Sequence, residues 1–305
     1  MWRRLRQSLS AHFVCAVVIA LAETPDADPD WQVAAGRKLS FEVASVKPSL
    51  DQPFRPPSFP LSDDDSFAGT GGHFFADFPV PVFIQFAYKI RPTPEQLKAM
   101  TAQLPKWVNT DRFTIDARAT GNPTKDQFRL MMRALLAERF GLRVHFETRA
   151  EKIFALTLAK PGRTGPKLIP HEQGPPCDAR IPVSKDGPQL PDRCDVSFLM
   201  MRGDGMARLG SRNTTLALLA STLPGAGNLG RPVVDQTGLQ GRFDYMMEYA
   251  SVRPSENPGN DAGQQAPAGP SFTTALREQL GLKLEATEGP IRELVIDHLN
   301  RPTEN

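Results

Sequence analysis

The sequence contains five histidines and three cysteines, residue types that often bind metals or act in acid–base and nucleophilic catalysis. Four histidines follow the first 22 residues: His73, His145, His171 and His298. None of them forms the His-Glu-x-x-His pair that presents two imidazoles to zinc on one helix face. We interpret His145 and His298 as surface or structural residues, and we expect neither a metal ion nor a cofactor.

Two further stretches resemble parts of hydrolase active sites. PVVDQTG is similar to the Asp-Thr-Gly turn of aspartic proteases, but Gln236 separates Asp235 from Thr237 and no second copy supplies a paired carboxylate. We interpret Asp235, Thr237 and Gly238 as a turn. Ser211 lies in LGSRN, which lacks the second glycine of a Gly-x-Ser-x-Gly elbow. We therefore predict no catalytic residue, and an extracytoplasmic hydrolase with dispersed catalytic groups is the alternative.

Three consecutive carboxylates, Asp63, Asp64 and Asp65, could contribute to a calcium site. Calcium loops place their oxygen ligands at spaced positions around a tight turn, and a simple acidic run lacks that spacing. We interpret these residues as a solvated turn.

Cys177 and Cys194 lie in one proline-rich segment. In an exported protein such a pair favours a disulfide, and closing a loop of this length stabilises the fold by about 3 kcal/mol. A metal or redox site is the alternative; it is expected to show a Cys-x-x-Cys spacing or nearby histidines, and only His171 is close in sequence. We predict a structural disulfide between Cys177 and Cys194.

The first 22 residues have the pattern of a secretory signal peptide. Arginines at positions 3, 4 and 6 precede an apolar run over 9–21, and small residues surround a cleavage site at Ala22. This run is shorter than the ~20 residues needed to span a bilayer, so we expect no membrane span after cleavage. Cleavage removes three arginines, which lowers the basic residues from 36 to 33 against 34 acidic residues and the net charge from +2 to −1. We therefore predict a periplasmic or extracellular protein that does not bind nucleic acid.

One phrase of the sequence occurs twice, as LLAERFGLRV (135–144) and ALREQLGLKL (275–284). Each predicts a helix with an apolar stripe, a glycine that ends it, and an alternating strand over 142–147 or 282–287. Apolar runs over 153–159 and 293–299 then predict a second strand, in the first copy as a hairpin partner and in the second as a closing strand.

The correspondence continues upstream, where DRFTIDARA parallels GRFDYMMEYA and VPVFIQFAY parallels TTLALLAST. Each half then has the order strand, helix, strand, helix, strand, strand. We predict an α+β fold of two pseudo-repeated β-α-β-α-β-β halves, with helices packed on a largely antiparallel sheet. The first repeat covers 41–160, a Pro/Gly-rich linker with the cysteine pair covers 161–205, and the second repeat covers 206–305 with a disordered insertion at 254–270.

Four ordered strings, FEVASVKP, LLAERFGLRVHFETR, GRPVVDQTGLQGRFDY and ELVIDHLNRPTEN, resemble a family of uncharacterised exported proteins abundant in soil bacteria. The resemblance covers residues 41–305 and implies a domain of unknown function, without catalytic or ligand residues to transfer. Some relatives resemble extracytoplasmic portions attached to membrane metallopeptidases of the antibiotic-sensor type, which implies sensing or binding.

These observations predict a non-catalytic extracytoplasmic binding or interaction module. Its partner would be a small ligand, a peptide or an envelope protein, bound in a groove between the two halves or along an exposed sheet edge. The alternatives are the hydrolase described above and a sensor partner of a membrane metallopeptidase.

Overall fold

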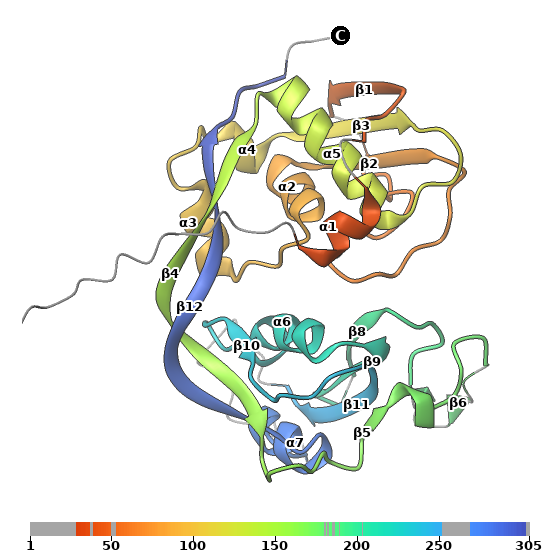
Figure 1. The fold of residues 1–305 in the computed structure, drawn as a ribbon, viewed down its shortest axis with the longest axis vertical. Coiled ribbons are helices and arrows are strands. Elements are labelled where there is room, and N and C mark those ends of the chain that lie inside the picture. Colours follow the sequence, from red (N-terminus) through yellow and green to blue (C-terminus); the bar gives the residue numbers. More distant parts are fainter. Residues whose placement is uncertain are drawn as a thin grey trace, which may run out of the picture.

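The computed structural model describes residues 29–36, 39–49, 53–179, 181, 183–184, 187–188, 190–202, 204–251 and 269–302. Within these ranges the chain forms two lobes joined by a long two-stranded ribbon (Figure 1). The predicted signal peptide, and residues 254–268 of the predicted insertion, lie outside the described residues. Among the helices described, none has the length and apolar character needed to cross a bilayer.

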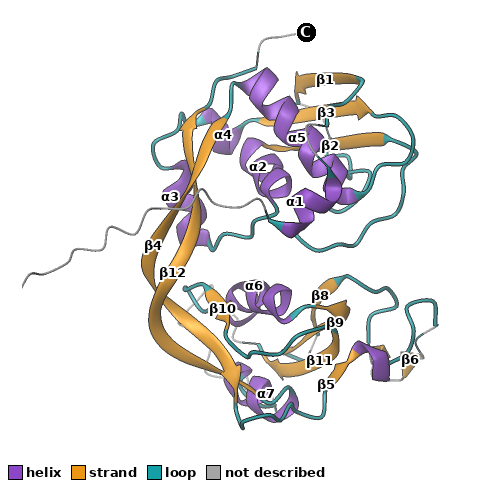
Figure 2. Cartoon of the chain, viewed as in Figure 1, coloured by secondary structure: helices purple, strands orange, loops and turns teal. Residues whose placement is uncertain are grey.

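The first lobe contains an antiparallel sheet in the order β1-β3-β2. Its strands are β1 (Val43–Pro48), β2 (His73–Pro79) and β3 (Arg112–Arg118). Its helices are α1 (Asp30–Ala35), α2 (Val80–Tyr88), α3 (Pro94–Thr101), α4 (Trp107–Thr110) and α5 (Lys125–Phe140). Helices α2 and α5 pack together beside the sheet (Figure 2), and the core between them is rich in phenylalanine.

The second lobe contains an antiparallel sheet in the order β5-β11-β9-β8. Its strands are β5 (Leu168–Pro170), β8 (Ser197–Met201), β9 (Met206–Thr214) and β11 (Phe243–Ala250). Its helices are α6 (Leu216–Gly227), α7 (Phe272–Gln279) and the 3-10 helix η1 (His171–Gln173). A short hairpin is formed by β6 (Val183–Ser184) and β7 (Gly187–Pro188). The segment 161–205, expected as a linker, thus contributes β5 and β8 to the main sheet of this lobe.

The ribbon between the lobes consists of β4 (Arg143–Leu158) and β12 (Leu282–His298), which are antiparallel along their whole length. The short strand β10 (Val233–Asp235) joins β4 in parallel at the end that lies in the second lobe. The prediction of separate strands over 153–159 and 293–299 is wrong. Each of these runs is the second part of one continuous strand, because β4 and β12 pair with one another instead of folding back on themselves.

The repeated phrase forms the same local structure at both sites. Thr124 and Gln127 form the predicted capping box at the start of α5, and Ser271 caps α7 through the backbone N–H of Thr274. After each helix a glycine with positive φ, at positions 141 and 281, leads into a long ribbon strand. With seven α-helices and mostly antiparallel sheets in the described ranges, the expected α+β class is confirmed.

Candidate functional site

A cleft of about 370 Å³ lies between the two lobes beside the ribbon. One wall is α3 with the residues that precede it, and a second wall is residues 291–296 of β12. The third wall comes from the second lobe, between α6 and β10. We call this space the interlobe cleft. Its volume falls in the range of small-molecule sites, which is about 300–1,000 Å³.

Helix α3 presents one face to the interlobe cleft. The lining residues Gln96, Ala99, Met100 and Gln103 are three or four positions apart, which places them on one side of a helix. The helix begins with a capping box in which Thr93 and Gln96 bond one another's backbone N–H groups. Helix α3 was not predicted from the sequence, although Thr-Pro-x-Gln is a recognisable start signal.

The ribbon presents its edge to the cleft. A strand face would contribute every second residue, but all six residues of 291–296 line the space. Strand β12 pairs with β4 on one side, and no strand in the described residues pairs with its other side. Backbone N–H and C=O groups along this edge are therefore available to a ligand.

The charged groups of the cleft are mostly basic. Three arginines, Arg91, Arg149 and Arg292, line it together with one carboxylate, Glu293. The Arg292 guanidinium stacks over the ring of Phe146 at 3.8 Å, which fixes its position at the ribbon. The lining thus holds three arginines and one glutamate, although Arg91 also pairs with Asp63 and Arg149 with Glu147, which lie outside the lining. An anionic ligand would compete with these two carboxylates for the guanidinium groups.

A second carboxylate, Glu151, lies next to Glu293 at the ribbon. Burial, the charge of Glu293 and a hydrogen bond with Glu293 together raise the pKa of Glu151. Gln96 donates to Glu293 through Nε2 at 3.3 Å. Glu151 is therefore protonated more readily than an isolated glutamate.

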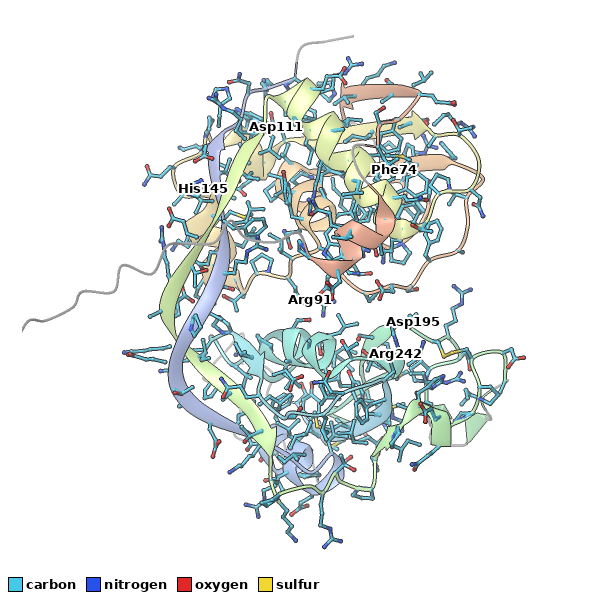
Figure 3. All side chains as sticks on the ribbon, in the orientation of Figure 1. Phe74, Arg91, Asp111, His145, Asp195 and Arg242 are labelled. Atoms are coloured by element: carbon cyan, nitrogen blue, oxygen red, sulfur yellow. A yellow bond between two sulfur atoms is a disulfide. The ribbon has the colours of Figure 1, made fainter. Side chains whose placement is uncertain are left out.

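The acidic run contacts the second lobe above the cleft. Ser221 donates its hydroxyl to Asp63 at 3.2 Å, and a guanidinium nitrogen of Arg242 lies 3.8 Å from Asp65. Arg242 also bonds Asp195 at 3.0 Å, and Figure 3 shows both side chains on the side of the second lobe that faces Arg91. These contacts help to hold the two lobes beside one another.

The expectation of a solvated turn at 63–65 is wrong, because every carboxylate there has a basic partner. Asp63 pairs with Arg91, Asp64 with Lys125 at 3.0 Å, and Asp65 with Lys89 at 2.7 Å. Burial opposes ionisation of Asp65, but Lys89 and two arginines outweigh it and lower the pKa of this carboxyl. Burial lowers the pKa of Lys125, against the raising effect of Asp64. The run therefore serves to join elements within the protein.

The other residues singled out in the sequence lie apart from the cleft. Asp235 accepts from the N–H of Thr237 at 2.9 Å and from its hydroxyl at 2.7 Å, which confirms the predicted turn. Ser211 is buried in β9, where its hydroxyl lies 3.5 Å from the carbonyl oxygen of Arg212. His145 is exposed between Asp297 and Glu147, and its hydrogen bonds to both raise its pKa. None of these arrangements brings a base to a nucleophile.

The predicted disulfide between Cys177 and Cys194 is present. Nε2 of His171 lies 3.4 Å from Sγ of Cys177, and Nδ1 lies 2.7 Å from the carboxylate of Asp244. His171 was recognisable from the sequence as a histidine close to the cysteines, but Asp244, which is 73 residues away, was not. The feature of the sequence that points to Asp244 is an aspartate at a buried position of a strand segment that is otherwise apolar, Phe-Asp-Tyr-Met-Met.

A family model described as "Protein of unknown function (DUF3738)" matches residues 82–299 of the chain. The match begins within α2 and runs to the end of β12, so it includes parts of both lobes and the whole ribbon. No curated protein and no solved structure matches the chain.

Proposed function

This chain belongs to the family of proteins of unknown function DUF3738, and we propose that it is a non-catalytic binding module for a small amphipathic anion. The supporting observation is the interlobe cleft, which combines apolar side chains such as Met100, Leu104 and Ile296 with three arginines against one glutamate. A carboxylate with an apolar tail or ring matches both features, because the tail can cover Met100 and Leu104 while the arginines attract the charge.

Binding can be measured as a rise in melting temperature, since a ligand that binds only the native state stabilises it by about 2.7 kcal/mol at 100 times its Kd. Octanoate, octanol and octylamine share one tail and differ in charge. We expect octanoate to raise the melting temperature most. Equal shifts with octanol and octylamine, or no shift with octanoate, would refute the proposed ligand class.

A matched pair of variants locates the site. Ala99→Trp places a large side chain in the cleft from an exposed position of α3, whereas Ala102→Trp adds the same ring at its exposed C-cap outside the cleft lining. We expect Ala99→Trp to abolish the octanoate effect and Ala102→Trp to retain it. If both variants respond like the unmodified protein, the ligand binds elsewhere.

Hydrolysis is the second candidate function, and the Glu151–Glu293 pair is the observation that favours it. A carboxyl with a raised pKa next to a second carboxylate can act as a general acid beside a base, and the pKa of Glu151 is raised. A panel of p-nitrophenyl esters and glycosides tests this candidate. Turnover that disappears in Glu151→Gln and Glu293→Gln would establish a hydrolase. Absence of turnover by the unmodified protein would reject hydrolysis and favour the binding function.

We also propose that the protein acts outside the cytoplasm, as the predicted signal peptide over 1–22 and the Cys177–Cys194 disulfide suggest. A role as sensor partner of a membrane metallopeptidase is one form that this binding function could take. Mass spectrometry of the protein from a periplasmic fraction should show a chain that begins at Glu23. A full-length chain that remains in the cytoplasm would contradict export.

A further inference from the structure

The disulfide lies beside a histidine and a buried carboxylate that the binding function does not use. Strand β5 pairs with β11 so that Ile169 faces Asp244, and His171 follows directly at the start of η1. Cys177 comes after η1, and Cys194 precedes β8. Side chains from three distant parts of the sequence thus meet at one edge of the second lobe.

The imidazole of His171 has a defined orientation. Its Nδ1 lies 2.7 Å from Oδ1 of Asp244, which also accepts the backbone N–H of Asn213 at 2.8 Å. Because a carboxylate only accepts hydrogen bonds, Nδ1 carries a proton and Nε2 faces the sulfur of Cys177 at 3.4 Å. The sulfur of Cys177, the imidazole and the carboxylate are therefore arranged like a nucleophile, its base and the acid that orients the base.

Asp244 is fully buried, and its Oδ2 has no hydrogen-bond partner among the described residues. A buried carboxylate oxygen without a partner destabilises the fold, so a purely structural account explains this arrangement poorly. Gly174 packs directly against it: a Cβ at position 174 would lie 2.2 Å from Oδ2. The segment that leads to Cys177 is therefore shaped around this carboxylate.

Arg212 holds both cysteine-bearing segments without help from the sulfur–sulfur bond. Its fully buried guanidinium donates to the carbonyls of Pro175 and Pro176 at 2.8 and 2.6 Å. It also donates to the carbonyls of Pro191 and Asp192, both at 3.2 Å. Each pair of carbonyls lies just before one cysteine. The two sulfurs should therefore stay close together when the disulfide is open.

We propose that Cys177–Cys194 is a redox-active disulfide that exchanges with dithiols, with Cys177 as the reactive sulfur and His171 as its base. Cys177 is exposed and Cys194 is half-buried, so a donor thiolate reaches Sγ of Cys177 first. Asp244 is a positioning residue, which acts by fixing the ring of His171.

The exchange balances in two steps. A thiolate of the donor attacks Sγ of Cys177, the sulfur–sulfur bond breaks, and Cys194 leaves as a thiolate that takes up a proton. The second donor thiolate then attacks the donor sulfur of this mixed disulfide, and Cys177 leaves as a thiolate stabilised by a proton on Nε2 of His171. Two electrons and two protons pass from the dithiol to the protein, and the donor becomes a disulfide.

The first experiment isolates the reactive sulfur. In Cys15→Ser/Cys194→Ser, Cys177 is the single thiol of the chain, and its alkylation by iodoacetamide can be followed against pH, with EDTA present to exclude metal ions. An ordinary cysteine titrates near pH 8.5, and we expect Cys177 to titrate at least about one unit lower. Adding His171→Asn or Asp244→Asn should return the midpoint toward 8.5. His73→Asn removes the corresponding ring from the exposed His73–Asp116 pair of the first lobe and should change nothing.

The second experiment uses the unmodified protein, so it does not depend on whether any variant folds. Dithiothreitol should reduce the disulfide at pH 7 without denaturant, while circular dichroism stays native and reoxidation restores the bond. His171→Asn should slow this reduction about threefold, because exchange rates follow roughly half of a pKa unit of thiolate stabilisation. A Cys177 thiol that titrates near 8.5 with native circular dichroism, or a disulfide that opens only after unfolding, would overturn the proposal.

Discussion

Ala150 and Pro290 are paired at the middle of the ribbon, and 140 residues separate them (290 − 150), as many as separate Gly141 from Gly281. The strands that follow these two glycines, β4 and β12, are thus antiparallel, and Ala150 and Pro290 are equivalent positions that pair at their centre. Each strand also enters both cores: Leu156 of β4 is buried in the second lobe, although β4 begins in the first. We hypothesise that an ancestral half was copied and that the two halves then exchanged their closing strands.

The two glycines of the repeated phrase should differ in how well they tolerate a side chain. Both have positive φ, 58° at Gly141 and 70° at Gly281, so alanine costs about 1–2 kcal/mol of backbone strain at either site. A Cβ at 281 would also lie 2.3 Å from the backbone nitrogen of Gly165, whereas the nearest atom at 141 is 3.5 Å away. We expect urea denaturation to show that Gly281→Ala lowers the free energy of unfolding by at least about 1 kcal/mol more than Gly141→Ala does. Equal losses would mean that the segment at Gly165 moves aside freely.

Local patterns in the sequence were sufficient to predict several structural elements. The capping box at Thr124 and Gln127, the glycine stops and the turn at Asp235 depend on neighbouring residues, and all were predicted correctly. The length of the ribbon strands was not predicted, because the polar residues at their centre resemble a turn. They are polar because that part of the ribbon runs between the lobes.

The candidate sites depend on contacts that local patterns do not contain. Asp244 reaches His171 only after β5 and β11 pair, and Arg212 contacts the prolines before both cysteines only after the loop closes. The interlobe cleft was expected in outline, as a groove between two halves. Its basic lining was not, because Arg91 and Arg292 are far apart in sequence and carry no motif.

Replacement of Arg212 should destabilise the protein at least as much as loss of the disulfide. In Arg212→Leu, four backbone carbonyls in a largely buried site lose the guanidinium that donates to them. We expect urea denaturation to show a free energy of unfolding lower by about 3–5 kcal/mol. The double variant Cys177→Ser/Cys194→Ser should lose about 3 kcal/mol on the chain-entropy model. Stability of Arg212→Leu within about 1 kcal/mol of the unmodified protein would show that the loop does not need this residue.

The carboxylate pair of the cleft should make stability depend on pH in acid. The pKa of Glu151 is raised in the folded protein, so its protonated form favours folding. This contribution is complete below the unfolded pKa of about 4.5 and is lost as pH rises through the folded value. We expect Glu151→Gln to stabilise the protein at pH 7 by less than about 1 kcal/mol, since the group is largely solvated, and to flatten the acid part of the profile. Lower stability of Glu151→Gln at pH 7 would contradict the repulsion from Glu293.

Tyrosine ionisation offers a prediction in the alkaline range. The chain has three tyrosines, and burial raises the pKa of each: Tyr245 and Tyr249 to about 12, and Tyr88 by a smaller shift that Arg133 opposes. Absorbance at 295 nm should therefore show little phenolate in the native protein at pH 10. In urea the same residues should be about half ionised at that pH.

The same shifts set the alkaline limit of stability. A group with a raised folded pKa contributes fully below its unfolded pKa, here about 10, and the contribution is lost as pH rises toward 12. Two pKa units correspond to about 2–3 kcal/mol for each of Tyr245 and Tyr249 by pH 12. Urea denaturation between pH 9 and 12 measures this loss, and Tyr249→Phe should reduce its slope because phenylalanine cannot ionise. An unchanged slope in Tyr249→Phe would show that this ring is solvated in the folded protein, despite its bond to the carbonyl of Ala226 at 2.7 Å.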